Sequence, residues 1–178
     1  MLAAHLARGL SVLIGALAVL LTYRVAREVV PGRPLIALAA AALAAFNPMF
    51  LFISGAVSND ALAAAVCTLG LWLLVRGLRQ PPAARRWAMV GAVLGLGALT
   101  KVSALGLWPL ALVVLGWVSW RRRSWRAFLR CGASMLAVGG LIAGWWYYRN
   151  WWLYRDPLGW KNFLAIMGRR SGPATPGV

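Results

Sequence analysis

The sequence predicts an all-α fold, a polytopic bundle of transmembrane helices. The chain is 62% hydrophobic with a mean hydropathy of +0.73, and its apolar runs approach the length that crosses about 30 Å of hydrocarbon. Its formal charge of +16 would point to nucleic acid in a soluble protein. Here the basic residues gather in short tracts between the apolar runs, as in loops that face anionic headgroups. We therefore expect membrane lipids, and no nucleic acid, as partners.

Six spans are expected, all helical because backbone groups in lipid must be satisfied within their own segment. The first span could be a signal peptide, but no small-residue cleavage site precedes Tyr23-Arg24, and Arg24 and Arg27 look like a stop-transfer flank. We place all six in one transmembrane domain covering 1–178, followed by an outer-face tail at 149–178. The predicted spans are 9–23, 35–53, 61–75, 87–99, 102–120 and 131–148.

Polar residues mark where the second span ends and the third begins. Pro48 should kink or end the second helix, because proline lacks an N–H donor and clashes with the preceding turn. Asn59 and Asp60 fit an N-cap for the third helix, where a side-chain oxygen accepts from exposed N–H groups. Asp60 could be only a cap. It could also be a functional carboxylate, as acids at a membrane interface often are, and the two roles are compatible.

The fourth and fifth spans could be read as one helix from 87 to 120. At about 1.5 Å per residue that helix would be about 51 Å long, far beyond the bilayer. A hairpin that turns near Thr100-Lys101 is therefore preferred, with a short fourth helix. Lys101 itself could be a snorkelling interfacial lysine or a functional cation.

The sixth span leads into YYRNWWLYRDPLGWKNF, the most distinctive stretch of the chain. Its rings could simply form an aromatic belt at the headgroup level. Alternatively, Arg149 within such a belt could offer a bidentate fork to a lipid phosphate. Asp156-Pro157 is expected to start a turn.

The basic residues test the span count independently. With six alternating spans, the three loops on one side collect twelve arginines, whereas the two loops on the other side hold only Lys101. By the positive-inside rule the arginine-rich side is cytoplasmic, so both termini lie outside. The twelve are Arg24, Arg27, Arg33, Arg76, Arg79, Arg85, Arg86, Arg121, Arg122, Arg123, Arg126 and Arg130.

An outside N-terminus with no preceding charged segment suggests that an upstream helix belongs to the complete protein. The final GRRSGPATPGV also ends without a closing element. We therefore expect this chain to be the middle of a longer protein.

The remaining motifs point to packing. Cys67 and Cys131 lie at different depths of the predicted topology, so we expect no disulfide. The small-xxx-small pairs Gly91/Gly95 and Gly140/Gly144 are typical of close helix contacts. His5 is the only histidine, and the sequence has no nucleotide-binding glycine loop and no metal-spaced Cys or His cluster.

The order of NP, SND at a helix start, LTK after a Gly-rich helix, and RN with YRDPLGW after a long helix resembles the GT-C glycosyltransferases that use polyprenyl-phosphate sugars. This group includes protein O-mannosyltransferases and aminoarabinose transferases. The resemblance covers about residues 8–160. It implies inverting sugar transfer from a lipid-phosphate donor to a lipid, glycan or protein acceptor, on the outer face of a bacterial plasma membrane.

The resemblance also implies site residues. Asp60 matches a second catalytic acid of the family, whereas the main acid sits in a first outer loop that this chain lacks, so we expect the chain to be inactive alone. Asp60 is also the candidate ligand for a divalent metal. Lys101 and Arg149 are the candidates for the donor phosphate, with Asn59, Asn150 and Tyr154 as further substrate contacts. The competing hypotheses are a transporter and a non-catalytic assembly subunit.

Overall fold

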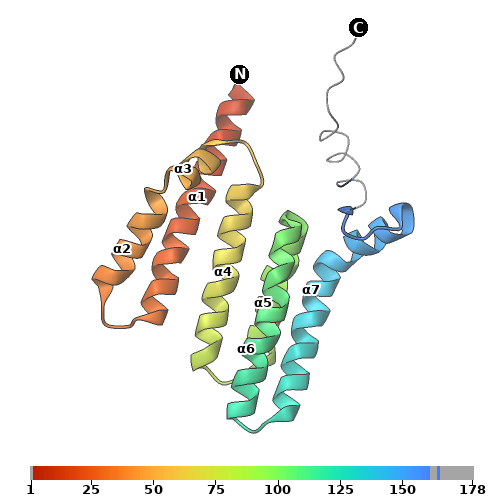
Figure 1. The fold of residues 1–178 in the computed structure, drawn as a ribbon. Coiled ribbons are helices and arrows are strands. Elements are labelled where there is room, and N and C mark those ends of the chain that lie inside the picture. Colours follow the sequence, from red (N-terminus) through yellow and green to blue (C-terminus); the bar gives the residue numbers. More distant parts are fainter. Residues whose placement is uncertain (1, 161–163, 165–178) are drawn as a thin grey trace. The chain divides into compact units, whose positions relative to one another are not determined.

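A computed structural model describes residues 2–160 and 164, and this part of the chain is helical and has no strand (Figure 1). The chain divides into two compact units, Met1–Ala143 and Gly144–Val178, and each is described by itself. The helices are α1 Leu2–Val29, α2 Pro34–Ala45, α3 Pro48–Gly55, α4 Asp60–Arg79, α5 Ala84–Thr100, the 3-10 helix η1 Val102–Gly106, α6 Leu107–Arg121 and α7 Trp125–Tyr154.

The helices of the first unit form an up-and-down bundle. In Figure 1, α1, α4 and α6 run in one direction, whereas α2, α5 and the first part of α7 run in the other. The fold class is the predicted one, a helical membrane bundle, but the count of six spans is not confirmed. Among the described residues, four helices are long and apolar enough to cross a membrane, or five if α2 and α3 together form one span. α5 has 17 residues, or about 26 Å, and is the short helix that the sequence predicted.

The predicted break at Pro48 is confirmed. α2 ends at Ala45, α3 begins at Pro48, and their axes differ by 60°. The Asn47 side chain accepts a hydrogen bond from the Phe50 N–H at 3.1 Å and so caps α3. Proline at the first position of α3 costs nothing, because its missing N–H would have had no partner in the helix.

The break before the fifth predicted span is also observed. α5 ends at Thr100, Lys101 is extended with φ −156° and ψ 136°, and η1 follows at Val102. This interruption separates α5 from α6, as the hairpin prediction requires, and it rules out one continuous helix across 87–120.

Side-chain size is distributed as expected for helices packed in lipid. The buried residues of α1 are Ser11, Gly15, Ala18 and Leu21, whereas Leu6, Leu10 and Leu13 are exposed. Small residues let helix backbones approach closely, and large apolar residues meet the acyl chains. This arrangement would leave a large apolar surface in water.

The core of the first unit lies among α4, α5, α6 and α7. It comprises Leu74, Trp87, Val90, Leu94, Ala111, Leu115, Cys131 and Met135. Within it, a Cβ built on Gly91 would collide with the Met135 backbone, and one on Gly95 would lie 2.9 Å from the Gly139 carbonyl oxygen. The packing prediction is therefore confirmed for Gly91 and Gly95. For Gly140 and Gly144 it is wrong, because a Cβ at either position would meet no described atom within 4 Å, and Gly139 makes the contact instead.

The two cysteines are free thiols, as expected. The short second unit contains the end of α7 and a turn. Asp156 Oδ1 accepts from the N–H groups of Leu158 at 3.2 Å and Gly159 at 3.0 Å, so the predicted turn at Asp156-Pro157 is confirmed. α7 extends to Tyr154, six residues beyond the predicted span, and the predicted outer tail at 149–178 thus begins within this helix. Residues 161–163 and 165–178 of that tail lie outside the described residues.

Candidate functional site

The candidate site lies where α4 begins and α5 ends, which we call the Asp60 end of the first unit. The opposite end, where α1, α4 and α6 finish, is called the arginine end. Arg76 Nε lies 3.4 Å from Glu28 Oε1, and Arg79 Nη2 donates to the Val29 carbonyl at 3.5 Å, so α4 finishes beside the end of α1. The predicted separation of Asp60 and Lys101 from the arginine tracts therefore agrees with the direction of the helices (Figure 1).

Asp60 is the first residue of α4, and it does not act as a side-chain cap. The Ser58 hydroxyl accepts from the Asp60 N–H at 3.3 Å, whereas the Asn59 side chain makes no capping bond. The predicted cap by Asn59 or Asp60 is therefore wrong. A carboxylate in the first turn still interacts favourably with the positive end of the helix dipole.

The Asp60 carboxylate is instead paired with Lys101. Lys101 Nζ lies 2.5 Å from Asp60 Oδ1, and the two side chains are 47% and 36% exposed, respectively. We call these two residues the Asp60–Lys101 pair. Lys101 has an extended backbone just after α5, and its side chain reaches the start of α4.

A second bond joins the same two segments. Asn59 Nδ2 donates to the Thr100 carbonyl oxygen at 2.8 Å. Thr100 is the last residue of α5, where backbone carbonyls have no partner within the helix, so the amide satisfies one of them. Asn59, Asp60 and Lys101 are thus brought together from positions 41 residues apart.

An open cavity of about 340 Å³ lies beside the Asp60–Lys101 pair. α4 contributes one wall, and α3 and η1 contribute the others. The lining is mostly small or apolar apart from the pair and one hydroxyl, and consists of Ile53, Asp60, Ala63, Ala64, Cys67, Lys101 and Ser103. The site therefore combines one negative and one positive charge with an apolar wall.

The residues present do not fit the metal suggested for Asp60. Mg²⁺ and similar ions need several oxygen ligands. Among the described residues, no three His, Cys, Asp or Glu side chains gather at one place, and Asp60 already faces an ammonium group.

The other predicted site residues lie in the second unit. Arg149 stacks over the Trp146 ring, with its guanidinium carbon 5.5 Å from the ring centroid. Asn150 is half-buried, and Tyr154 is the exposed last residue of α7. That these three residues share a substrate with Asp60 remains a prediction.

Sequence reasoning missed Ser58 and Thr100 as the residues that fix this site. The sequence did contain a signal for Ser58, because a serine just before a helix commonly accepts a hydrogen bond from one of the first backbone N–H groups of that helix. The role of Thr100 had no local signal, since it acts through a backbone carbonyl that any residue would supply.

Comparison with known proteins gives a match to one family. Residues 4–148 match the family described as dolichyl-phosphate-mannose-protein mannosyltransferase, which covers all of the first unit beyond its first three residues. No curated protein and no solved structure matches the chain. The described helices form a bundle with membrane-length apolar helices, and the family match covers most of the chain. The chain is therefore an integral membrane protein that belongs to the dolichyl-phosphate-mannose-protein mannosyltransferase family, whose members are glycosyltransferases of the GT-C kind.

Proposed function

We propose that this chain serves the transfer of a sugar from a polyprenyl-phosphate donor to a lipid, glycan or protein acceptor, at the Asp60 end of the bundle. The observation that carries the proposal is the Asp60–Lys101 pair beside an open, largely apolar cavity. A lipid-linked sugar needs a charged contact for its phosphate next to an apolar surface for its chain, and this end of the bundle offers both.

Lys101 is the proposed phosphate contact. Its ammonium group has three N–H donors and Asp60 Oδ1 occupies one, so others remain for a phosphate oxygen. When the glycosidic bond breaks, negative charge develops on the departing lipid phosphate, and a fixed cation stabilises that charge in the transition state. Ile53, Ala63 and Ala64 supply the apolar wall for the first isoprene units.

Asp60 has two proposed roles. One carboxylate oxygen holds Lys101 in place, and the other can accept a proton from an acceptor hydroxyl as a general base. The resemblance to the GT-C enzymes implies that Asp60 acts with a further acid of a first outer loop. Arg149, Asn150 and Tyr154 are proposed as additional donor contacts.

The charge distribution supports an orientation. With twelve arginines in its three turns and in the helix ends beside them, the arginine end is proposed to face the cytoplasm of a bacterial cell. The Asp60 end and both ends of this chain then lie on the outer face of the plasma membrane, where a polyprenyl-linked sugar would be consumed in building the cell envelope.

The test measures donor binding and sugar transfer by the full-length protein in lipid nanodiscs. Lys101→Ala should lose a charge-assisted hydrogen bond worth about 1.5–3 kcal/mol, which is a loss of about 10- to 150-fold in donor affinity. Asp60→Asn should bind donor within a few-fold of wild type but transfer sugar at least about tenfold more slowly, because the amide cannot accept the proton.

Arg122→Ala is the matched control, since it also removes one positive charge but at the arginine end. It should leave both measurements unchanged. Wild-type donor affinity in Lys101→Ala would refute the phosphate role, and wild-type transfer in Asp60→Asn would refute the catalytic role. A transporter would move the sugar lipid without forming a new glycoside, so mass spectrometry of the acceptor separates that hypothesis from ours.

A further inference from the structure

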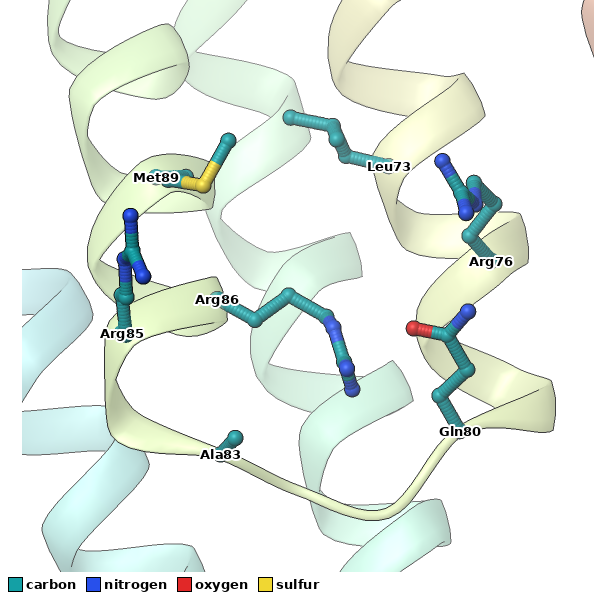
Figure 2. Close-up of a pocket in the computed structure, with 7 residues that line it drawn as sticks. All are labelled: Leu73, Arg76, Gln80, Ala83, Arg85, Arg86 and Met89. Atoms are coloured by element: carbon teal, nitrogen blue, oxygen red, sulfur yellow. The ribbon is translucent and has the colours of Figure 1, made fainter.

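A second polar cavity lies at the arginine end, between the end of α4 and the start of α5 (Figure 2). Its volume is about 360 Å³. The lining contains three arginines, one amide and no acid, and consists of Leu73, Arg76, Gln80, Ala83, Arg85, Arg86 and Met89. Since α4 has 20 residues and is about 30 Å long, this cavity is separate from the one beside Asp60.

The three guanidinium groups retain most of their hydrogen-bonding capacity. Arg76 is paired with Glu28 at 3.4 Å and lies over the Trp72 ring, 4.9 Å from its centroid. Arg86 Nη1 donates to the Pro81 carbonyl oxygen at 2.7 Å. Among the described residues, Arg85 has no hydrogen-bond or ion-pair partner. Because each guanidinium has five N–H donors, many remain for an anion.

The start of α5 adds positive charge to the same cavity. α5 begins at Ala84 with no side-chain cap and no acid in its first turn, and this turn carries Arg85 and Arg86. Arginines at the positive end of a helix dipole are unfavourable, and a bound anion would reverse that effect. In Figure 2 the Arg86 side chain extends into the space between the helices, toward Gln80.

The apolar part of the lining identifies the kind of anion. Leu73 precedes Arg76 in α4 and Met89 follows Arg86 in α5, so both lie nearer the middle of the bundle, and Figure 2 shows them in the upper part of the view. A lipid presents its phosphate at the membrane surface and its acyl chains toward the middle, in the same order. Basic pockets between transmembrane helices are known to accept anionic lipid headgroups.

We propose that this cavity binds the phosphate of an anionic phospholipid, held by Arg85 and Arg86 with Gln80, with the first part of an acyl chain against Leu73 and Met89. Binding there would join the end of α4 to the start of α5 and neutralise the excess positive charge between them. The site is distinct from the proposed donor site and does not depend on it.

The experiment uses the full-length protein purified in detergent and native mass spectrometry with added phosphatidylglycerol, phosphatidylcholine or soluble glycerol phosphate. Wild type should retain phosphatidylglycerol in preference to phosphatidylcholine. The double variant Arg85→Gln/Arg86→Gln should bind phosphatidylglycerol at least tenfold more weakly. Arg121→Gln/Arg122→Gln removes the same charge from the same end without touching the cavity lining, and should bind like wild type.

Equal phosphatidylglycerol binding by both double variants would overturn the proposal, because general attraction to the basic surface would then explain retention. Full competition by glycerol phosphate would also overturn it, in favour of a site for a free phosphate. If the glutamine variant does not fold, Arg85→Lys/Arg86→Lys replaces it. This variant keeps the charge and loses the planar fork, and it should still bind the lipid more weakly than wild type.

Discussion

Gly91→Ala tests whether the close contact between α5 and α7 holds the first unit together. A Cβ at position 91 would overlap the carbonyl group and Cα of Met135, and backbone atoms cannot rotate away as a flexible side chain can. The two helices would have to separate around a core that includes the fully buried Leu94 and Met135. Overpacking of this kind costs about 1–3 kcal/mol.

The gain that opposes this cost is alanine's better helix propensity, about 0.8–1.0 kcal/mol in water. The net effect of Gly91→Ala should therefore range from near zero to a destabilisation of about 2 kcal/mol. Gly140→Ala is the matched control, because it makes the same chemical change in α7 where a Cβ meets no described atom within 4 Å. That variant should have the same propensity gain without the overpacking cost, so it should be more stable than Gly91→Ala by about 1–3 kcal/mol.

The assay is thermal unfolding of the full-length protein in detergent, followed by the fraction that remains monodisperse after heating. Gly91→Ala should unfold several degrees below Gly140→Ala, since about 1 kcal/mol corresponds to about 2–4 °C in a domain of this size. Equal midpoints for the two variants would show that α5 and α7 do not approach as the structure has them, and would refute the reasoning.

Two further predictions concern the Asn47 cap and the topology. Asn47→Ala should destabilise the protein by about 0.5–2 kcal/mol through loss of its bond to Phe50, whereas Asn47→Asp should retain most of the stability in the same heating assay. In a full-length protein without other accessible cysteines, Asp60→Cys should react with a membrane-impermeant thiol reagent from outside the cell, and Arg122→Cys should react only after the membrane is opened. Labelling of both from the same side would contradict the proposed orientation.

Much of the bundle could be predicted because hydropathy, proline and charge act locally. The break at Pro48 follows from the missing N–H of proline, and the break near Thr100 follows from the length that a bilayer allows. Each depends on a few neighbouring residues, so the sequence alone is sufficient. The span count was less secure, because a 17-residue helix such as α5 lies near the lower limit for crossing a membrane.

Pairwise contacts between helices could not be predicted in the same way. Glycine spacing indicated that some face of α7 packs closely, but the rotation of α7 decides whether Gly139 or Gly140 meets α5, and that rotation depends on the whole core. The same holds for Asp60. Its position at the start of a helix made a cap the natural local interpretation, whereas its observed partner comes from 41 residues away.

The exposure of the Asp60–Lys101 pair argues for its role in function over a role in stability. With 47% of the Lys101 side chain and 36% of the Asp60 side chain exposed, the pair is screened by solvent and contributes about 0–1 kcal/mol to folding. The bond from Asn59 to Thr100 joins the same segments without any charge, so the helix ends would stay together if the pair were broken. Because the pair contributes so little to folding, a substitution that breaks it should disturb the proposed contact with the donor phosphate at little cost in stability. The expected separation of effects follows directly: Asp60→Asn should leave the unfolding midpoint nearly unchanged while it slows sugar transfer.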